Sequence, residues 1–175
     1  MTILHTPFTR DDLAGLSVGD TVLLSGTILT ARDAAHKRLI ALLDAGQPLP
    51  VSLAGQAIYY VGPCPAPPGQ VIGSCGPTTS GRVDPYTPAL LAQGLLGMIG
   101  KGQRSSAVIE AMREHGAVYF AATGGAGALI AQCVTAARVV AFEELGAEAI
   151  FELTVENFPL IVAIDAQGKN LYDRA

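Results

Sequence analysis

Residues 70–85, with the sequence QVIGSCGPTTSGRVDP, place an apolar run, a polar loop and a helix-start signal in direct succession. The run Gln70–Ser74 predicts the end of a strand. The loop Gly76–Arg82 gathers hydroxyls, backbone amides and one guanidinium. Asp84 followed by Pro85 predicts a helix N-cap with proline at the first helical position. We therefore expect a strand, loop and helix in which the loop presents its amides and Arg82 at the positive end of the helix.

Hydroxyls, amides and a guanidinium together favour binding of an anion, and a carboxylate or phosphate is the expected ligand. The alternative is a turn rich in glycine and serine whose hydroxyls only cap the following helix. The spacing of the residues leaves both interpretations open.

Segments typical of strands and helices alternate along the rest of the chain. We expect strands at 21–29, 57–61, 95–99, 117–122, 139–142, 151–155 and 160–164, and helices at 34–45, 87–94, 105–115 and 128–137. Residues 1–15 are expected to be an irregular lead-in, and 123–127 a glycine-rich turn. Several strands are joined by proline or glycine loops in place of helices. The pattern predicts the α/β class with a mixed sheet, in a single domain over residues 1–175.

The composition and charge of the chain argue against several classes of protein. Half of the 175 residues are hydrophobic, yet no apolar run reaches the length of a membrane helix. Residues 1–5 lack the pattern of a secretion signal, so we expect a cytoplasmic protein with no membrane partner. The net charge of −4 gives no electrostatic reason to expect nucleic acid. Residues 20–105 nevertheless hold six basic and four acidic side chains, so positive charge is concentrated around the loop.

The cysteines Cys64, Cys75 and Cys133 are widely spaced and form no metal-binding pattern. Free thiols in a reducing compartment are the expected state of all three. A four-iron cluster needs three or four converging thiolates, so this chain is not expected to hold one, or any other metal, by itself.

Three motifs in order carry a family resemblance: residues 30–38 (TARDAAHKR), 76–84 (GPTTSGRVD) and 98–102 (MIGKG). Over residues 16–172 the chain resembles the beta subunit of iron–sulfur-dependent fumarate hydratases and L-tartrate dehydratases, which corresponds to the C-terminal domain of single-chain class I fumarases. The resemblance implies a swivelling β/β/α domain. It also implies a hydro-lyase, a small dicarboxylate substrate and a hetero-oligomer with an alpha subunit that carries a 4Fe-4S cluster.

Two cationic side chains are candidates for substrate binding on chemical grounds. Arg82 can hold a carboxylate through two parallel hydrogen bonds, although an arginine ahead of a helix is otherwise often solvated. Arg32 stands where a strand meets a helix and is a second carboxylate ligand. His36 follows one turn later and is a possible site residue, although it is more simply an ordinary hydrogen-bonded histidine. Asp33 is expected to cap the helix and is the other possible site residue.

The resemblance assigns roles to the remaining site residues. It makes Thr78 the group that exchanges the proton on the substrate carbon, and Lys101 a carboxylate ligand or a cation that favours ionisation of Thr78. Lys101 lies between two glycines, which lets it approach a ligand closely. Thr79 and Ser80 are expected to shape the loop and to hydrogen-bond the substrate.

The sequence thus predicts the beta subunit of a hydro-lyase that interconverts fumarate and malate. L-tartrate dehydration is the alternative reaction. An alternative of a different class is a non-catalytic module that binds a carboxylate or phosphate.

Overall fold

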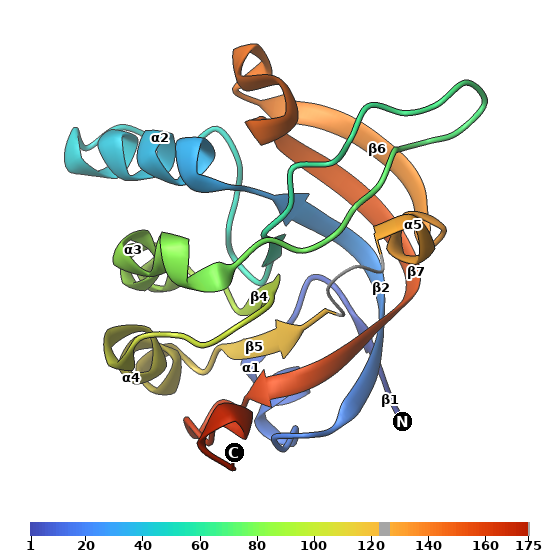
Figure 1. Ribbon diagram of the computed structural model, residues 1–175. Helices are drawn as coiled ribbons and strands as arrows, with labels where there is room; N and C mark the ends of the chain where they lie inside the picture. Colours follow the sequence, from blue (N-terminus) through green and yellow to red (C-terminus); the bar gives the residue numbers. More distant parts are fainter. Residues whose placement is uncertain (123–126, 175) are drawn as a thin grey trace.

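A computed structural model describes residues 1–122 and 127–174 as a mixed α/β structure (Figure 1). Its strands are β1 (Thr2–His5), β2 (Thr21–Thr30), β3 (Ala57–Tyr59), β4 (Gly97–Gly100), β5 (Val118–Ala121), β6 (Val134–Ala141) and β7 (Ile150–Ile164). Its helices are α1 (Arg10–Ala14), α2 (Asp33–Asp44), α3 (Thr87–Ala92), α4 (Ser106–His115) and α5 (Gly127–Ala131), with 3-10 helices η1 (Ser80–Tyr86), η2 (Glu143–Glu148) and η3 (Leu171–Arg174). The turn predicted at 123–127 lies outside the described residues except for Gly127, which begins α5.

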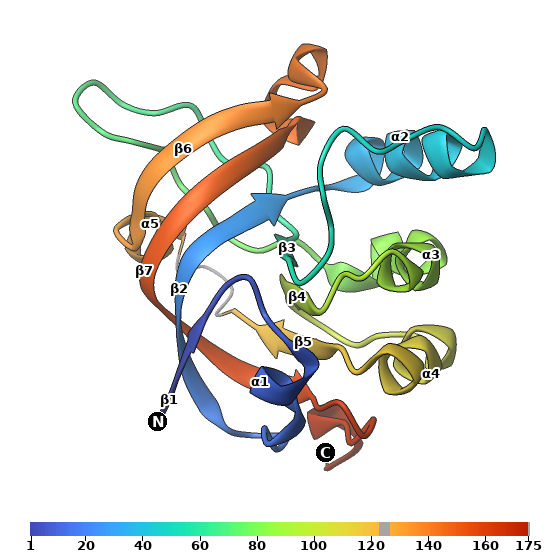
Figure 2. The ribbon, with the colours of Figure 1, turned by 180° about the vertical axis from the view of Figure 1, so that it is seen from behind.

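The seven strands form one sheet that closes on itself. Strands β2, β3, β4 and β5 are parallel neighbours in that order. Strand β7 pairs antiparallel with β5 and also with β2, which completes the ring. Strand β1 is added parallel to β2, and β6 antiparallel to β7 (Figure 2). The predicted α/β class with a mixed sheet is confirmed.

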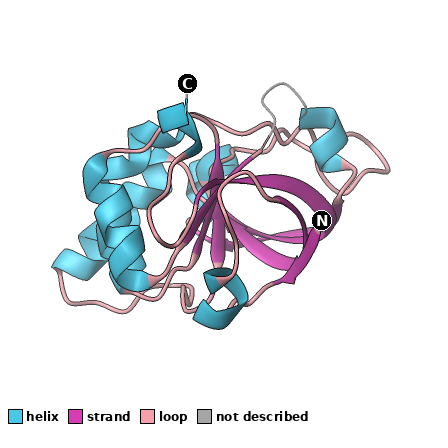
Figure 3. Ribbon diagram, turned by 90° about the horizontal axis from the view of Figure 1, so that it is seen from below, coloured by secondary structure: helices cyan, strands magenta, loops and turns pink. Residues whose placement is uncertain are grey.

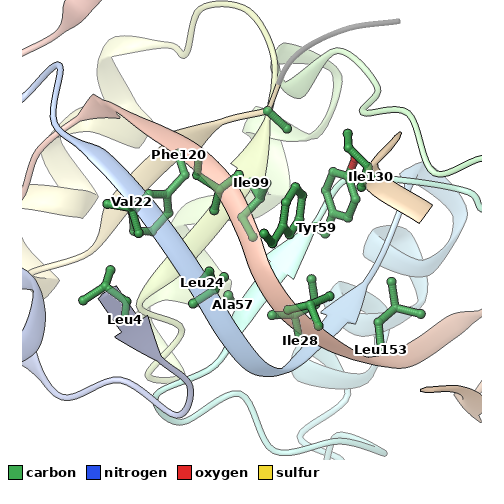
Figure 4. Close-up of a cluster of buried hydrophobic side chains, with 14 of the residues drawn as sticks. Leu4, Val22, Leu24, Ile28, Ala57, Tyr59, Ile99, Phe120, Ile130 and Leu153 are labelled. Atoms are coloured by element: carbon green, nitrogen blue, oxygen red, sulfur yellow. The ribbon is translucent and has the colours of Figure 1, made fainter. Parts of the chain in front are cut away.

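Both faces of β3, β4 and β5 are buried, which explains their continuous apolar sequences. Alternate residues of each strand enter two different hydrophobic clusters. In β3, Ala57 and Tyr59 face the interior of the closed sheet, whereas Ile58 faces the helices. Figure 4 shows the interior cluster, in which Tyr59 and Ile99 lie among side chains from β2 and β7. Helices α2, α3 and α4 cover the outer face of the parallel strands (Figure 3).

The helix expected at 105–115 is observed as α4, from Ser106 to His115. The Ser105 side chain accepts a hydrogen bond from the Val108 amide, which caps the N-terminus of α4. Gly116 ends the helix in the left-handed conformation, at φ 74°. These caps form because serine and glycine satisfy the free backbone groups at the two helix ends.

Two predicted caps are wrong. Arg32, and not Asp33, occupies the N-cap position of α2, and within the described part of the chain its side chain makes no capping hydrogen bond. Pro85 lies inside η1, and α3 begins only at Thr87 after the N-cap residue Tyr86. The Asp84 carboxylate instead binds Arg104 and the Ser105 amide. A distant arginine has therefore displaced the local capping role of Asp84.

The predicted irregular lead-in at 1–15 is also wrong, because it contains β1 and α1. β1 takes its place from parallel pairing with β2, a long-range contact that its own short sequence does not reveal. Residues 70–74 were expected to end a strand but form a loop, held by paired hydrogen bonds between Cys64 and residues 73 and 74.

The C-terminal elements differ from prediction in their boundaries. The helix expected at 128–137 ends at Ala131, and residues from Val134 onward form β6. The two strands expected at 151–155 and 160–164 are one strand, β7. Asn157, which lies between the two expected strands, has a positive φ of 51°, and β7 continues through it because asparagine tolerates this conformation.

None of the helices within residues 1–122 and 127–174 combines the length and apolar character needed to cross a membrane.

Candidate functional site

The sequence-predicted residues lie at one edge of the sheet, where the parallel strands β2, β3 and β4 end. Arg32 follows β2, Tyr60 follows β3 and Lys101 follows β4. The segment Thr78–Ser80 runs along this edge and is hydrogen-bonded to residues that follow β3 and β4. The green segment after the long proline-rich loop can be followed past the end of β2 in Figure 1. In α/β proteins, with open sheets and with closed barrels alike, ligands bind beyond the carboxyl ends of the parallel strands.

Thr78 is held twice by a single carbonyl group. Its amide donates to the Tyr60 carbonyl at 2.8 Å, and its Oγ1 hydroxyl donates to the same oxygen at 2.9 Å. The side chain is half-buried. Because the proton of the hydroxyl points to the carbonyl, the lone pairs of Oγ1 are directed away from it. Thr78 thus has a defined orientation before any ligand arrives.

The next two residues join the loop to the end of β4. Thr79 forms a parallel bridge with Lys101, and the Ser80 amide donates to the Lys101 carbonyl at 3.0 Å. The side chains of Thr79 and Lys101 are exposed. Within the described residues, Lys101 forms no ion pair. Its ammonium group is therefore available to a ligand.

Ser80 is fully buried and has a structural set of hydrogen bonds. Its Oγ lies 2.7 Å from the Tyr119 hydroxyl, which itself donates to the Gly102 carbonyl at 2.8 Å. Because the single Tyr119 proton goes to Gly102, Ser80 is the donor to Tyr119. Ser80 thus fastens the loop to β5, whereas its predicted hydrogen bond to substrate remains a prediction.

Arg82 lies in η1 with its guanidinium exposed to solvent. It donates from Nη2 to Asp33 Oδ2 at 2.8 Å, with 56% of the Arg82 side chain and 35% of the Asp33 side chain exposed. This ion pair joins η1 to the first residue of α2. Exposed pairs of this kind contribute little to stability, so an incoming anion can replace Asp33 at small cost.

Arg32 packs against the chain directly after β3. A Cβ atom on Gly62 would lie 2.9 Å from Arg32 Cδ and 3.1 Å from Nη1, so the Arg32 side chain lies directly against the Gly62 backbone. The Arg32 Nε is buried and has no hydrogen-bond partner among the residues that the structure describes. Buried donors are normally paired, so an unpaired one is a candidate for contact with an anion.

His36 is buried beside the same edge of the sheet. Its Nδ1 lies 2.8 Å from the Arg32 carbonyl, and its ring packs on Tyr60 and Tyr86 at centroid distances of 5.6 and 6.1 Å. Burial lowers its pKa to about 4, so the ring is neutral at pH 7 and Nδ1 is the protonated nitrogen. This is a packed, hydrogen-bonded histidine that supports Arg32 and Tyr60.

The sequence analysis missed Arg104 as a structural centre of the site. This arginine follows Lys101 by three residues, and its side chain is fully buried. It contacts Tyr60 and Tyr119, which bind Thr78 and Ser80, and it pairs with Asp84, which lies in η1 together with Arg82. No spacing pattern reveals it, because these partners come from separate segments.

Cysteines of this chain do not form a metal site in the described residues. No group of three or more histidine, cysteine or acidic side chains is positioned there to hold a metal ion. Cys64 is exposed, Cys133 is partly buried, and burial raises the pKa of Cys75 to about 12, which keeps its thiol protonated. The donor set does not fit a cluster held by this chain.

Two cavities flank the proline-rich loop and not the segment Thr78–Ser80. One, of about 510 Å³, lies between residues 67–74 and α5; the other, of about 440 Å³, lies between residues 63–72 and β6. In the candidate site, the side chains of Arg82 and Lys101 are exposed, whereas the Arg32 Nε is buried.

The fold and this edge define an α/β domain with a polar, cation-bearing loop beyond the ends of its parallel strands. Comparison with known proteins identifies the family. The family model described as Fumarase C-terminus matches residues 2–175. The chain belongs to this family, which confirms the predicted resemblance.

Three relatives illustrate the relationship. The chain is 40% identical over 170 residues to "Fumarate hydratase class I, anaerobic" of Escherichia coli and 38% identical over 167 residues to "Fumarate hydratase 2" of Leishmania major. Each alignment covers 94% of this chain but only 31% and 29% of those relatives. It is 39% identical over 179 residues to "Putative L(+)-tartrate dehydratase subunit beta" of Methanocaldococcus jannaschii, covering 99% of this chain and 92% of that protein. The chain therefore spans less than a third of the fumarate hydratases but nearly the whole of the archaeal subunit.

Proposed function

We propose that this chain is the beta-type component of a hydro-lyase that adds water to, or removes it from, a small dicarboxylate. The observation that carries the proposal is the gathering of Arg32, Arg82, Lys101 and the Thr78 hydroxyl at the carboxyl edge of β2, β3 and β4. Three cations there match two carboxylates, and the orphan Nε of Arg32 supplies an unused donor. The family relationship supports the reaction class.

Thr78 has the proposed role of exchanging the proton at the substrate carbon. A threonine hydroxyl is a weak base at neutral pH, so it needs positive charge nearby to ionise. Lys101, whose backbone bridges the neighbouring Thr79, is the proposed source of that charge. Arg32 and Arg82 would then hold the carboxylates in position. Thr79 adds an exposed hydroxyl to this edge and is proposed to hydrogen-bond the substrate.

The proposal places a 4Fe-4S cluster on an alpha partner, because the cysteines described here do not converge. Such a cluster would supply Lewis-acid chemistry at the substrate hydroxyl. The separate beta subunit among the relatives supports a hetero-oligomer, since it has about the length of this chain. We further propose the cytoplasm as the compartment, because the three thiols are free.

Fumarate and malate are the first candidate pair, and L-tartrate is the second. The tartrate alternative is favoured by one observation: the relative that this chain matches over nearly its full length is named as a tartrate dehydratase subunit. Both substrates present two carboxylates, so the cations on this edge do not distinguish them.

The decisive experiment is anaerobic reconstitution of this chain with a cysteine-bearing alpha chain encoded by a neighbouring gene. Fumarate, malate and L-tartrate are each supplied, and turnover is measured for the mixture and for either chain alone. We expect turnover only in the mixture. Tight binding of a dicarboxylate without turnover of any of the three would instead support a non-catalytic binding module.

A further inference from the structure

Arg104 is a buried cation outside the set of proposed substrate ligands. It lies between β4 and α4, and its side chain has no exposed surface. Its guanidinium carbon lies 5.1 Å from the ring centroid of Tyr60 and 4.8 Å from that of Tyr119. Contact with aromatic faces stabilises a desolvated guanidinium. Because the side chain is enclosed, a substrate at the edge of the sheet does not reach it.

Four hydrogen bonds surround this guanidinium. Nε donates to Asp84 Oδ1 at 2.7 Å, and Nη2 donates to the Tyr60 hydroxyl at 3.2 Å and to Thr87 Oγ1 at 3.1 Å. Nη1 points to Met98 Sδ at 3.5 Å. Burial acts to lower the pKa of Arg104, but Tyr60 and Asp84 outweigh it and raise the pKa overall, so the group stays charged. A buried charge persists only when it is paired and hydrogen-bonded in this way.

The partners of Arg104 are the residues that hold the functional loop. Tyr60 accepts both hydrogen bonds of Thr78 through its carbonyl. Tyr119 binds the Ser80 hydroxyl. Asp84 stands two residues after Arg82 in η1, and its second oxygen accepts from the Ser105 amide at 2.7 Å. One side chain thus contacts the supports of the whole segment from Thr78 to Asp84.

We propose that Arg104 is the positioning residue of the active site: it fixes Tyr60, Tyr119 and Asp84 so that the Thr78 hydroxyl is held in one orientation. This inference rests on the proposed function for its catalytic consequence, whereas its structural part concerns this chain alone. Lysine does not replace it, because one ammonium group cannot reproduce the planar fork that reaches Asp84, Tyr60 and Thr87 together.

The first test concerns the structure of the full chain by itself and requires no activity. Amide hydrogen exchange of Thr78 and Ser80 is measured in Arg104→Met, with Arg113→Met on the exposed surface of α4 as the matched control. We expect exchange of both amides to accelerate about tenfold or more in Arg104→Met, because their supports are released, and to be unchanged in Arg113→Met. Wild-type exchange rates at both amides in a folded Arg104→Met protein would overturn the proposal.

A milder variant keeps the test decisive if Arg104→Met does not fold. Tyr119→Phe retains the ring beneath Arg104 but loses the hydroxyl that joins Ser80 to Gly102. Exchange at the Ser80 amide is expected to accelerate, and that at Thr78 to remain near the wild-type rate. No change at Ser80 would contradict the proposed coupling between this network and the loop.

The second test is a double-mutant cycle in the active complex with the alpha partner. Arg104→Met should lower kcat by about 10–100-fold, the usual cost of a misplaced catalytic group, while KM changes by about threefold or less. In a Thr78→Ala background the same change should cost only about twofold, because Arg104 acts through Thr78. Equal losses of kcat in the two backgrounds would show a role in general stability. If the wild-type complex turns over no dicarboxylate, the proposed function fails, and the exchange measurements still decide the role of Arg104.

Discussion

Arg82 and Asp33, which are 49 positions apart in the chain, form an ion pair at 2.8 Å between η1 and the first residue of α2. Arg82, which is predicted to bind the substrate, is thus already paired with a carboxylate of its own chain. Both side chains are partly exposed, so the pair is weak and can be exchanged. Asp33 occupies one guanidinium nitrogen in the way that a substrate carboxylate would.

Substitution of the two partners should therefore have opposite effects on substrate binding. Arg82→Lys keeps the charge but loses the fork, and should weaken binding by about 2 kcal/mol. Asp33→Asn removes the competing carboxylate and should tighten binding by at most about 1 kcal/mol. Dissociation constants measured by calorimetry on the assembled complex test both. Arg38→Lys is the control, since Arg38 forms a similar exposed pair with Glu144 at 2.8 Å.

A large fall in melting temperature for Arg82→Lys, with unchanged substrate affinity, would show that this arginine only joins η1 to α2.

Thr78→Ala separates proton transfer from binding. The variant loses the hydroxyl held by the Tyr60 carbonyl but keeps Arg32, Arg82 and Lys101. Turnover should fall about hundredfold or more, with little change in the substrate dissociation constant. Thr79→Ser keeps an exposed hydroxyl and is the mild control. Wild-type exchange of the substrate carbon-bound proton with deuterated solvent in Thr78→Ala would eliminate Thr78 as the base.

The isolated chain should contain no stoichiometric iron. Its Cys75 thiol is buried and protonated at pH 7, and Cys64 and Cys133 lie in the proline-rich loop and before β6. Anaerobic iron analysis and a visible spectrum of the purified chain check this expectation. A stable four-iron cluster on the chain alone would contradict the assignment of the cluster to a partner.

His36 should make the folded state sensitive to acid. Its pKa is lowered by burial from 6.5 to about 4, so in this pH range the unfolded chain binds a proton that the folded chain does not. The free energy of unfolding should therefore decrease as the pH falls from about 6.5 to about 4, with a contribution from His36 of about 3 kcal/mol. Above this range His36 has no effect on the pH dependence.

Denaturant unfolding of His36→Gln at several pH values measures that contribution. The slope of stability against pH should decrease between about pH 6.5 and 4 relative to wild type, and His5→Gln on the exposed strand β1 is the control. Identical slopes for wild type and His36→Gln would contradict the buried neutral state.

Gly100→Ala should destabilise the fold by about 1–3 kcal/mol through overpacking. A Cβ atom at this position would overlap the Ser80 hydroxyl and lie 2.7 Å from Tyr60 Cδ2. Gly15→Ala is the matched control, because a Cβ there meets no atom within 4 Å among the described residues. Thermal unfolding of the two variants gives the comparison, and equal melting temperatures would disprove the tight packing of Ser80 against β4.

Elements with local signals could be predicted from the amino-acid sequence. The apolar runs at 57–61, 95–99 and 117–122 predicted β3, β4 and β5, and the pattern at 105–115 predicted α4. The three motifs predicted the family, which the family model confirms, because a resemblance in sequence can be recognised without knowing how the chain folds. Thr78, Arg82 and Lys101 could be named as candidates for the same reason.

How those candidate residues are held depends on contacts between distant segments, which local patterns do not reveal. Strand β1, the continuity of β7 and the closure of the sheet depend on pairing between segments far apart in the chain, which no local pattern encodes. Asp84 shows the same effect for a single side chain. Its sequence context predicted a helix cap, but its carboxylate is instead paired with the buried guanidinium of Arg104. Leaving a buried cation unpaired costs about 3–5 kcal/mol of stability, whereas losing one helix cap costs about 1 kcal/mol. The ion pair with the distant Arg104 is therefore favoured over the local cap.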